Sequence, residues 1–450
     1  MDFSKAFNLN DIRGRYGKEV TSELVYRVAR AFVIYFKCKN VIIGRDMRLS
    51  SPVLAKAFIK GVIDEGANAI DIGLVSSDAL YFATAFFKKP GAMITASHNP
   101  SEYNGIKFSL ANAIPINNGR DLDKIRKIAE KNDFKFKTKK GKIIRKDITR
   151  QYVEHVHSFI NIKKLRKMKI IVDAGNGMAG KFFPLISKNL PIQVIPLDFN
   201  LDGRFPDHDA NPSKRKNVLH LEKIMKEKKC DFGVAFDGDI DRVVFVNEKA
   251  HRTDSSLIAS LIIKHILEKK PKSKFVYNSV MSKVVQEIAE KYGGKAFKER
   301  VGHLFMKRTM RKVNAEFGAE NSGHFYYKKN YYVDSGIITF LIVAEIYSQY
   351  AGKFSDMVRE FKKYRKIDEK SLKIVEKNKD KIFDEIKKHY SKKAEKTDNF
   401  DGLTIYFKDW WFNIRKSNTE PLVRLNLEAD NKKLMIEKKR EVVKLIRKFS

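Results

Sequence analysis

The chain has 450 residues, 43% of them hydrophobic, which is enough to build packed cores and excludes an intrinsically disordered protein. Because one domain usually takes roughly 100–200 residues, the length alone predicts about three domains. Lys and Arg number 90 against 54 Asp and Glu, so the net charge is +36, which suggests an anionic partner. The only two cysteines, Cys38 and Cys230, exclude a disulfide framework or a cysteine-rich zinc module and indicate reduced thiols in a cytoplasmic protein.

Short β-branched runs that end in Gly or Asp, each followed by a helical pattern, recur in three groups along the chain. They lie near residues 41–95, 170–237 and 275–318. Strand, loop and helix in this order predict an α/β architecture, in which ligands bind beyond the carboxyl ends of the strands. We therefore expect three related α/β modules with mixed sheets.

The densest basic run, Lys131 to Lys146, lies at the outer edge of the first module and lacks the interleaved aromatic residues of a single-strand binder. The basic residues are otherwise spread over many helices. Most of the charge is best explained as solvated surface. Specific nucleic-acid binding and a basic cleft for small anionic substrates remain as alternatives.

The longest apolar stretch, Ile337 to Ala344, is far shorter than the ~20 residues of a membrane span.

After about residue 366 the pattern of hydrophobic residues changes. A helical stretch, Ile374–Lys396, precedes three strand-like runs and a final helical pattern, which predicts a smaller α+β domain. The runs are Leu403–Phe407, Trp410–Ile414 and Leu422–Leu427, and the final helical pattern is Lys432–Phe449. The predicted domains are thus four: residues 1–150, 151–252, 253–366 and 367–450.

Two segments combine reactive side chains with the end of a predicted strand. In Thr95-Ala96-Ser97-His98-Asn99-Pro100, Ser97 is a candidate nucleophile or, equally, a helix-capping serine. Lys107 follows shortly after as a candidate phosphate partner or proton shuttle. In Asp237-Gly238-Asp239-Ile240-Asp241-Arg242, three carboxylates alternate. Three like charges in one loop are costly without a cation, and carboxylate oxygens are hard ligands of the kind that Mg²⁺ prefers. A magnesium site is therefore favoured over the alternative, a plain acidic turn.

Two later segments could bind a sugar and a phosphate. Gly318-Ala319-Glu320-Asn321-Ser322-Gly323-His324 places hydrogen-bonding groups between small residues, although a plain loop would look the same. Arg415-Lys416-Ser417-Asn418-Thr419-Glu420-Pro421, with Arg424 after it, brackets a polar turn with two guanidiniums. Such a turn can cradle a phosphate, or it can be a capped turn with surface arginines.

Taken in order, these four segments resemble the serine, metal, sugar and phosphate loops of the α-D-phosphohexomutase superfamily, in its phosphomannomutase/phosphoglucomutase branch. Further matches are D-I-R-G at Asp11–Gly14, G-R-D-M-R-L-S-S at Gly44–Ser51 and D-G-R-F-P at Asp202–Pro206. The resemblance spans essentially the whole chain. It implies a four-domain, heart-shaped enzyme with a central cleft that interconverts hexose 6-phosphates and hexose 1-phosphates, acting on mannose, glucose or both.

The resemblance also assigns roles. Ser97 would carry the phosphoryl group and, with Asp237, Asp239 and Asp241, hold one Mg²⁺, with hexose 1,6-bisphosphate as intermediate and activator. The other catalytic residues implied are Arg13, His98, Lys107, Arg242 and His303. The substrate-binding residues implied are Glu320, Ser322, His324, Arg415, Ser417, Asn418, Thr419 and Arg424. Hexose phosphates are then the partners, with no specific nucleic acid and no membrane.

Some positions depart from the family pattern. Asn10 stands where many bacterial members of the family have Tyr, and no Lys stands within Val276–Ser282, where some members place one in the third module. His208–Pro212 also differs from the H-x-P-N-P stretch of many relatives. These departures bear on sugar preference, so phosphoglucosamine mutase remains the alternative activity, although S-N-T-E-P and Asn321 favour the glucose/mannose branch. Met1–Lys5 leads into no signal peptide, and we expect a cytoplasmic monomer or homodimer.

Overall fold

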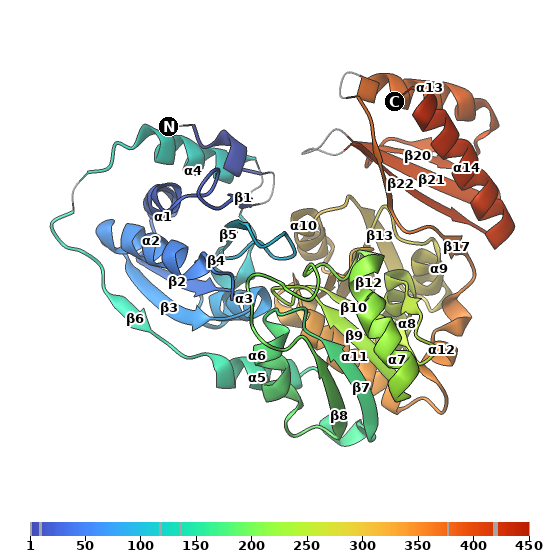
Figure 1. Cartoon of the computed structure of the whole chain (residues 1–450), viewed down its shortest axis with the longest axis horizontal. Coiled ribbons are helices and arrows are strands. Elements are labelled where there is room, and N and C mark those ends of the chain that lie inside the picture. The colour runs from blue at the N-terminus through green and yellow to red at the C-terminus, as the bar shows by residue number, and fades with distance from the viewer. Residues whose placement is uncertain are drawn as a thin grey trace. The chain divides into compact units, whose positions relative to one another are not determined.

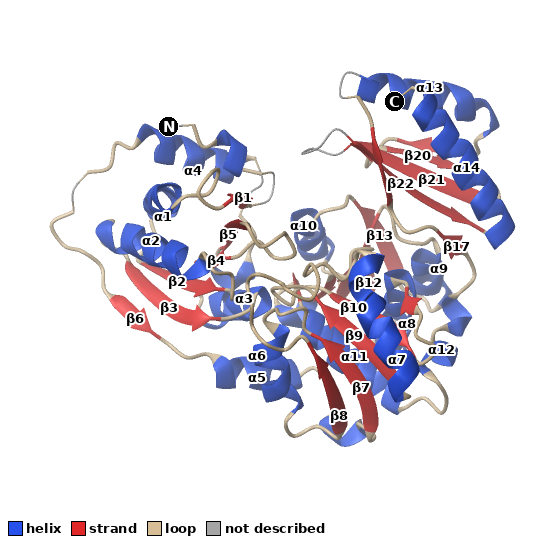
Figure 2. Ribbon diagram, in the orientation of Figure 1, coloured by secondary structure: helices blue, strands red, loops and turns tan. Residues whose placement is uncertain are grey.

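The computed structural model describes residues 2–8, 11–116, 119–135, 137–375, 378–416 and 422–449. The chain forms two compact units, each built from two separate stretches. The first unit is Met1–Ser255 with Lys307–Met357, and the second is Ser256–Met306 with Val358–Ser450. Figure 1 labels the elements along the chain, and Figure 2 shows that helices and strands alternate through most of it. The predicted α/β class with mixed sheets and a smaller C-terminal domain is confirmed.

The first sheet of the first unit has the order β1-β5-β4-β2-β3-β6. Its central strands run parallel, while β5 is antiparallel to both β1 and β4. Val41, Ile42 and Ile43 are fully buried, as expected for a strand covered on both faces. The strands are β1 Ile12–Arg15, β2 Asn40–Arg45, β3 Asn68–Leu74, β4 Gly91–Ile94, β5 Tyr103–Ser109 and β6 Ile143–Arg145.

Helices cover both faces of this sheet. Three helices share one hydrophobic core with Val41 and Ile43. A fourth helix, α3, lies on the opposite face of the sheet. A Cβ added at Gly44 of β2 would lie 3.4 Å from Leu80 of this helix. The helices of the shared core are α1 Ser22–Phe36, α2 Ser51–Asp64 and α4 Arg120–Lys131, and the helix on the opposite face is α3 Ser77–Phe86.

The second sheet of this unit has the order β11-β10-β9-β7-β8. It joins a parallel trio to an antiparallel edge, which places the loop after β9 at the carboxyl end of the sheet. The elements of this part are α5 Thr149–His157, β7 Met168–Asp173, α6 Ala179–Ser187, β8 Ile192–Leu197, α7 Leu219–Lys228, β9 Phe232–Phe236, β10 Val243–Asn247 and β11 Arg252–Thr253.

The chain returns to the first unit within α10, and a short antiparallel meander and a buried helix complete that unit. Ser335 caps α11 by accepting from the Ile338 N–H at 3.2 Å. The apolar stretch at residues 337–344 lies in α11 and is buried all round. Within the described residues, no helix is long and apolar enough to cross a bilayer. The elements are α10 His303–Val313, β14 Phe317–Ala319, β15 Phe325–Tyr327, β16 Val333–Asp334, α11 Gly336–Ser348 and α12 Phe354–Met357.

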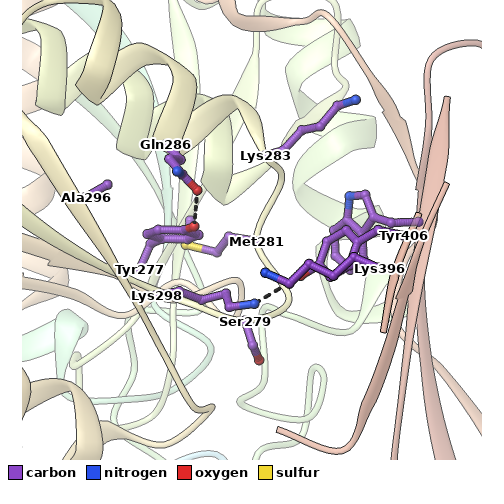
Figure 3. A pocket seen from close by; sticks show the side chains of 10 residues that line it. Tyr277, Ser279, Met281, Lys283, Gln286, Ala296, Lys298, Lys396 and Tyr406 are labelled. Carbon is purple, nitrogen blue, oxygen red and sulfur yellow. Dashed lines mark hydrogen bonds between the residues drawn. The ribbon is translucent and has the colours of Figure 1, made fainter. Parts of the chain in front are cut away.

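The second unit combines a parallel strand pair with the C-terminal sheet. Ile382 and Val442, from the last two helices, pack with strand residues such as Phe412 in one core. A cavity between the strand pair and the sheet is drawn in Figure 3. The elements are α8 Ser255–Lys269, β12 Lys274–Asn278, α9 Val284–Lys291, β13 Lys295–Glu299, β17 Arg365–Lys366, β18 Lys370–Lys373, α13 Lys379–Tyr390, β19 Lys396–Asp398, β20 Leu403–Tyr406, β21 Trp410–Lys416, β22 Leu422–Ala429 and α14 Lys432–Lys448.

The C-terminal elements agree with the sequence prediction except in one helix. The helix expected over residues 374–396 is shorter, because α13 ends at Tyr390 and Lys396 already pairs with Tyr406 across β19 and β20. The final helix and the three preceding strands form where the pattern predicts them. Cys38 and Cys230 are both free thiols, and burial raises the pKa of Cys38 to about 12.

Candidate active site

The loop between β4 and β5 presents Ser97 in an unusual backbone conformation. Ser97 has φ +50°, a left-handed conformation that costs energy for a residue with a side chain. Its N–H donates to Thr95 Oγ1 at 2.8 Å, and the residue is only 2% exposed. The strain is tolerated because the surrounding contacts fix the loop, and this aims the hydroxyl at one place.

The side chain of Arg48 holds this serine loop in place through hydrogen bonds to its backbone. Arg48, which is fully buried, donates to the backbone carbonyls of four loop residues at 2.6–2.9 Å. Its Nε lies 3.4 Å from Asp46 Oδ2, and its guanidinium lies over the Phe205 ring at 4.9 Å. The four acceptors are the carbonyls of Ser97, Asn99, Pro100 and Tyr103.

The acidic loop after β9 brings its three carboxylates together. One oxygen from each of Asp237, Asp239 and Asp241 lies within 4.8 Å of the others, and all three residues are buried. Ile240 between them has φ +66°, which is rare for a β-branched residue. Backbone bonds hold the loop in place, because the Ser77 N–H donates to the Asp239 carbonyl at 3.1 Å and the Gly336 N–H to the Ile240 carbonyl at 2.9 Å.

The serine loop and the acidic loop meet directly. Ser97 Oγ donates to Asp237 Oδ2 at 2.9 Å, although 140 residues separate the two in sequence. Lys107 Nζ donates to Asp239 Oδ2 at 2.6 Å and to Asp241 Oδ2 at 2.7 Å. The approach requires glycine at position 238, since a Cβ there would lie 2.7 Å from the Ser97 carbonyl oxygen. A hydroxyl, three carboxylates and one ammonium therefore share one buried volume.

Burial and mutual repulsion divide the protons unequally among these carboxylates. Burial, together with the charges of Asp241 and Asp239, raises the pKa of Asp237 well above its ordinary value. Burial acts in the same direction on Asp239, but Lys107 outweighs it and lowers the pKa of that carboxyl. The charged form of Lys107 is stabilised in turn. Burial lowers the pKa of Lys107, but Asp239 and Asp241 outweigh burial and hold that pKa well above its usual range.

The acidic loop has the donor set of a cation site. Oδ1 of Asp239 and Oδ1 of Asp241 are buried and accept no hydrogen bond within the described part of the chain. Three buried carboxylates in one loop are a set of hard oxygen donors that suits a divalent cation such as Mg²⁺. Asp237, Asp239 and Asp241 can therefore hold a metal ion, with Ser97 Oγ beside them.

Three more of the predicted catalytic side chains surround the serine. Arg13 donates from Nη1 to Asn99 Oδ1 at 2.8 Å and pairs with Asp11. His98 Nδ1 lies 3.3 Å from Ser97 Oγ, and burial, then Arg242 and Arg13, lowers the pKa of that imidazole well below its ordinary value. Arg242 Nε lies 3.8 Å from Asp237 Oδ2. A neutral imidazole thus lies beside the hydroxyl, while Arg13 contacts the serine loop and Arg242 contacts the acidic loop.

The predicted sugar loop, residues 318–324, joins the same unit through a network that the sequence did not reveal. His324 Nδ1 lies 2.7 Å from Asp334 Oδ2 and 3.6 Å from Asp241 Oδ1. Lys307 Nζ pairs with Asp334 Oδ1 at 2.8 Å and lies 4.1 Å from the Tyr81 ring centroid. Asp334 therefore orients the imidazole of His324 next to the acidic loop.

The other two sugar-loop candidates are held differently. Glu320 is buried and accepts from the Tyr326 hydroxyl, and its N–H donates to the His324 carbonyl at 2.9 Å. Ser322 is half-buried, and its carbonyl accepts from Ser213 Oγ at 2.8 Å. The side chain of Ser322 is thus carried on a loop whose backbone is fixed.

The remaining predicted residues lie in the second unit. His303 is the first residue of α10, after Gly302 with φ +137°. Arg415 and Arg424 are opposite each other on β21 and β22, and Glu369 bridges them, with Nη–Oε distances of 2.8 and 3.4 Å. Ser417, Asn418 and Thr419 lie outside the described residues. The two arginines are thus held as a pair.

Sequence reasoning missed the residues that support the site. Arg48 stands in the segment Gly44–Ser51, which matched the family pattern without an assigned role. Ser77 follows the end of β3, and its Oγ donates to Asp239, so the rule that ligands gather at strand ends could have found it. Lys307 and Asp334 carry no local signal, because each is an isolated charge whose partner is distant in sequence.

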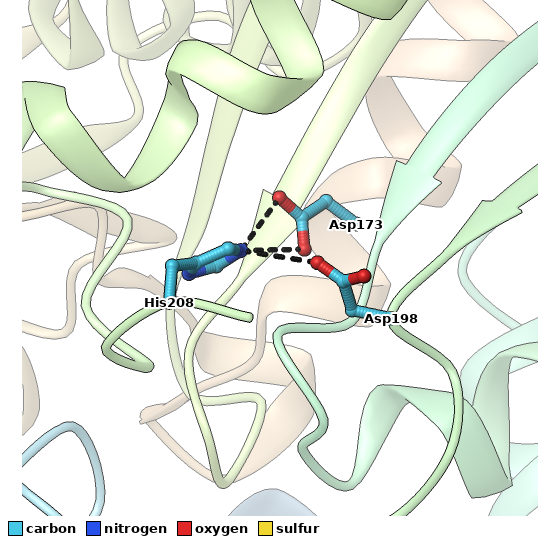
Figure 4. A group of neighbouring side chains, drawn as sticks. All are labelled: Asp173, Asp198 and His208. Carbon is cyan, nitrogen blue, oxygen red and sulfur yellow. Dashed lines mark hydrogen bonds and ion pairs between the residues drawn. The ribbon is translucent and has the colours of Figure 1, made fainter. Parts of the chain in front are cut away.

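A second acidic group, the acid–histidine triad of Asp173, Asp198 and His208, lies at the ends of β7 and β8 and in the loop that follows β8. His208 Nε2 lies 3.1 Å from Asp173 Oδ2 and 3.4 Å from Asp198 Oδ2, as Figure 4 shows. Burial opposes a charged imidazole, but these two carboxylates outweigh it and raise the pKa of His208 to about 11. The triad is therefore an internal ion pair that fastens the loop around residue 208 to the end of β7.

Comparisons with known proteins follow this architecture along the whole chain. Four domain models, all described as phosphoglucomutase/phosphomannomutase, match in order. The alpha/beta/alpha domains I, II and III match residues 4–154, 150–250 and 254–364, and the C-terminal domain matches residues 369–445. Fold and site together define an enzyme of the phosphohexose mutase class.

Individual relatives agree. A phosphomannomutase of Vibrio cholerae is 33% identical, and one of Methanocaldococcus jannaschii is 35% identical, each match covering 98% of both chains. The crystal structure of a phosphoglucomutase/phosphomannomutase family protein from Burkholderia thailandensis superposes with a TM-score of 0.88 at 26% identity, over 99% of this chain and 98% of that one. The chain belongs to the phosphoglucomutase/phosphomannomutase family.

Proposed function

We propose that the protein interconverts the 1-phosphates and 6-phosphates of mannose, glucose or both, through a phosphoryl group carried on Ser97. The observation that carries this proposal is the contact of Ser97 Oγ with Asp237 Oδ2 at 2.9 Å, inside the buried group of carboxylates and Lys107. A hydroxyl so placed is poorly suited to a structural capping role, because it faces groups that manage charge and protons.

The reaction is a pair of phosphoryl transfers. The bond between the phosphorus and Ser97 Oγ breaks as the phosphorus bonds to the free hydroxyl oxygen of the bound hexose phosphate. The proton that this hydroxyl loses is balanced by the proton that Ser97 Oγ gains as it leaves. The sugar then carries two phosphates and reorients within the site. Its other phosphoryl group is transferred to Ser97 by the reverse chemistry. Both steps need neutralisation of charge more than covalent help from other side chains. The hexose 1,6-bisphosphate is then also the activator that reloads Ser97.

The charged residues around Ser97 divide the work. Asp237, Asp239 and Asp241 would hold Mg²⁺, which when bound neutralises charge on the transferring phosphoryl group. Arg13, from beside the serine loop, and Arg242, from beside Asp237, would add guanidinium donors to the transferring phosphoryl group. Lys107 is charged and neutralises Asp239 and Asp241, and it or His303 would handle the hydroxyl proton. His98, whose pKa burial lowers, is neutral and would support the serine loop.

Binding of the substrate would use the loops away from the serine. Glu320 and Ser322 offer acceptors to sugar hydroxyls, and His324 is held in a fixed orientation by Asp334. Arg415 and Arg424 form a paired guanidinium surface suited to the phosphate that is not reacting, together with Ser417, Asn418 and Thr419. His303 is proposed as a further proton-handling group at the start of α10.

A turnover comparison tests the proposal. The protein is incubated with Mg²⁺, a trace of the hexose 1,6-bisphosphate and, in parallel, mannose, glucose or glucosamine 1-phosphate. We expect 6-phosphate product from mannose, glucose or both. Product from glucosamine 1-phosphate alone would favour phosphoglucosamine mutase, and no product from any sugar would refute the proposal.

The role of the serine has its own control. Ser97→Ala should abolish most turnover, whereas Ser101→Ala, an exposed serine in the same loop, should leave it intact. Mass spectrometry of the protein after incubation with the bisphosphate should find the phosphoryl group in the wild type and in Ser101→Ala only. Full activity in Ser97→Ala would show that the phosphoryl group travels by another route.

A further inference from the structure

The second unit contains a cavity of about 350 Å³ that none of the predicted site residues line. A volume of this size is within the range of small-molecule sites. The cavity lies between the β12–β13 pair with α9 on one side and the C-terminal sheet on the other (Figure 3). We call it the lysine pocket, and its lining residues are Tyr277, Ser279, Met281, Lys283, Gln286, Ala296, Lys298, Lys396, Tyr406 and Trp411.

The charge of the lining has one sign. Three of the ten lining residues are lysines, and none is acidic. Lys298 Nζ crosses the space between the two walls, donating to Asp398 Oδ2 at 2.6 Å and to Tyr406 Oη at 3.0 Å. Lys283 Nζ pairs with Asp430 Oδ1 at 3.4 Å and lies 4.0 Å from the Tyr364 ring centroid, and Lys396 is exposed at the start of β19. Lys283 and Lys298 are thus already ion-paired, and Lys396 is the ammonium group that the pocket offers to an anion.

One wall of the pocket is a row of side chains built by strand register. Lys396 is opposite Tyr406 across β19 and β20, and Tyr406 is opposite Trp411 across β20 and β21, so the three lie side by side on one face of the sheet. The rings of Tyr406 and Trp411 have centroids 6.2 Å apart. Trp411 Nε1 already donates to Glu428 Oε1 at 2.8 Å, which leaves its ring as an apolar surface.

The opposite wall is also apolar with satisfied polar groups. Tyr277 and Met281 are buried, and the Tyr277 hydroxyl donates to Gln286 Oε1 at 2.7 Å (Figure 3). Ser279, at the edge of the cavity, donates to Asp401 Oδ2 at 2.5 Å. An apolar space walled by aromatic rings and edged by ammonium groups suits a planar ring that carries a negative group.

From this arrangement we propose that the lysine pocket binds a small anion bearing a planar ring, of the nucleoside monophosphate class. The anionic group contacts Lys396, and the ring lies against Tyr406 and Trp411. This site is separate from the proposed reaction, because Asp237 and the other carboxylates of the acidic loop do not line it. The pocket is linked to the arginine pair, since Asp401, the partner of Ser279, lies 4.0 Å from Arg415 Nη1.

Calorimetric titration of the full chain with adenosine monophosphate tests this. We expect saturable binding at physiological salt that persists when mannose 1-phosphate is present in excess, and weaker binding of both adenosine and inorganic phosphate. Lys396→Glu, an exposed charge reversal, should weaken binding at least about fivefold. The matched control Lys393→Glu, exposed in the turn before β19, should change it less than about twofold.

The outcomes are decisive in both directions. Displacement by mannose 1-phosphate would assign the nucleotide to the proposed substrate site and overturn the proposal, as would equal losses in the two lysine variants. Equal affinity for inorganic phosphate would overturn the role of the rings. A second variant, Tyr406→Leu, keeps the volume apolar but removes the ring, and unchanged affinity there would contradict the stacking contact. Mutase turnover in Lys396→Glu should equal the wild type, so failure here leaves the proposed function standing.

Discussion

Replacement of Arg48 by methionine should both destabilise the protein and impair its reactive loop. The guanidinium is fully buried and supplies four hydrogen bonds to the carbonyls of the loop that carries Ser97. Methionine fills most of the volume but donates nothing, so those carbonyls and the Asp46 carboxylate lose their partner. The loop that holds the candidate nucleophile then has no central anchor.

The size of the loss follows from known costs. Removing one partner of a buried ion pair costs about 3–5 kcal/mol. Four charge-assisted hydrogen bonds would sum to more, at about 1.5–3 kcal/mol each, but the loop can relax and let water reach some carbonyls. We therefore expect a loss of about 3–5 kcal/mol, which corresponds to a fall in melting temperature of roughly 6–20 °C. Misplacement of the serine by about 1 Å should lower kcat by a further ~10²-fold at temperatures where the variant stays folded.

Thermal unfolding and steady-state kinetics of Arg48→Met measure both effects. Arg204→Met is the matched control, because Arg204 forms its ion pair with Asp202 on the surface and should contribute less than about 1 kcal/mol. Adding Asp46→Asn to Arg48→Met should recover part of the stability, since it removes the unpaired charge. A melting temperature and kcat in Arg48→Met equal to those of the Arg204 control would refute the anchoring role.

Three further outcomes are expected. Asp239→Asn should raise the Mg²⁺ concentration needed for half-maximal turnover roughly tenfold or more, measured by metal titration, and an unchanged requirement would remove it from the cation site. Gly238→Ala should lower kcat by ~10²-fold because its Cβ would press on the Ser97 carbonyl at 2.7 Å, whereas Gly233→Ala, whose Cβ meets only flexible side-chain ends, should lower it far less. In the acid–histidine triad, the folded pKa of His208 is about 11, above its unfolded value near ~6.5. Its stabilisation is therefore complete below pH ~6.5 and is lost as pH rises toward 11, so the stability gap between wild type and His208→Gln, measured by urea unfolding, should narrow between pH 7 and pH 10. A gap that stays constant over that range would mean that the imidazole is neutral.

The fold was predictable wherever local pattern determines it. The run Val41–Ile43 is buried on both faces in β2, and the acidic loop does follow a buried strand, because an apolar β-branched run bounded by Gly or Asp carries its own signal. The helix predicted over Ile374–Lys396 is too long, because Lys and Glu favour helix locally. In the structure Lys396 pairs with Tyr406 and belongs to a strand instead.

The candidate site was predictable only at its motifs. Ser97 and the three aspartates stand in short segments that share a recognisable pattern. Their supports do not, because Ser77 meets Asp239 across 162 residues and Lys307 meets Asp334 only after the chain has passed through a helix and a meander. Contacts of this kind depend on the tertiary arrangement and leave no periodic trace in the sequence.

The division of the first unit into two stretches has a consequence for synthesis on the ribosome. Asp78, next to the Ser77 that supports the acidic loop, accepts from Ser335 Oγ at 2.7 Å, and the two are 257 residues apart. At about 5–20 residues per second, roughly 13–50 s separate their synthesis. During that interval Asp78 has no Ser335 hydroxyl to accept from, and the serine and acidic loops have no Asp334 beside them. The nascent chain should therefore expose an incomplete reaction centre until Met357 has left the exit tunnel, which makes this unit a candidate client of chaperones that bind growing chains.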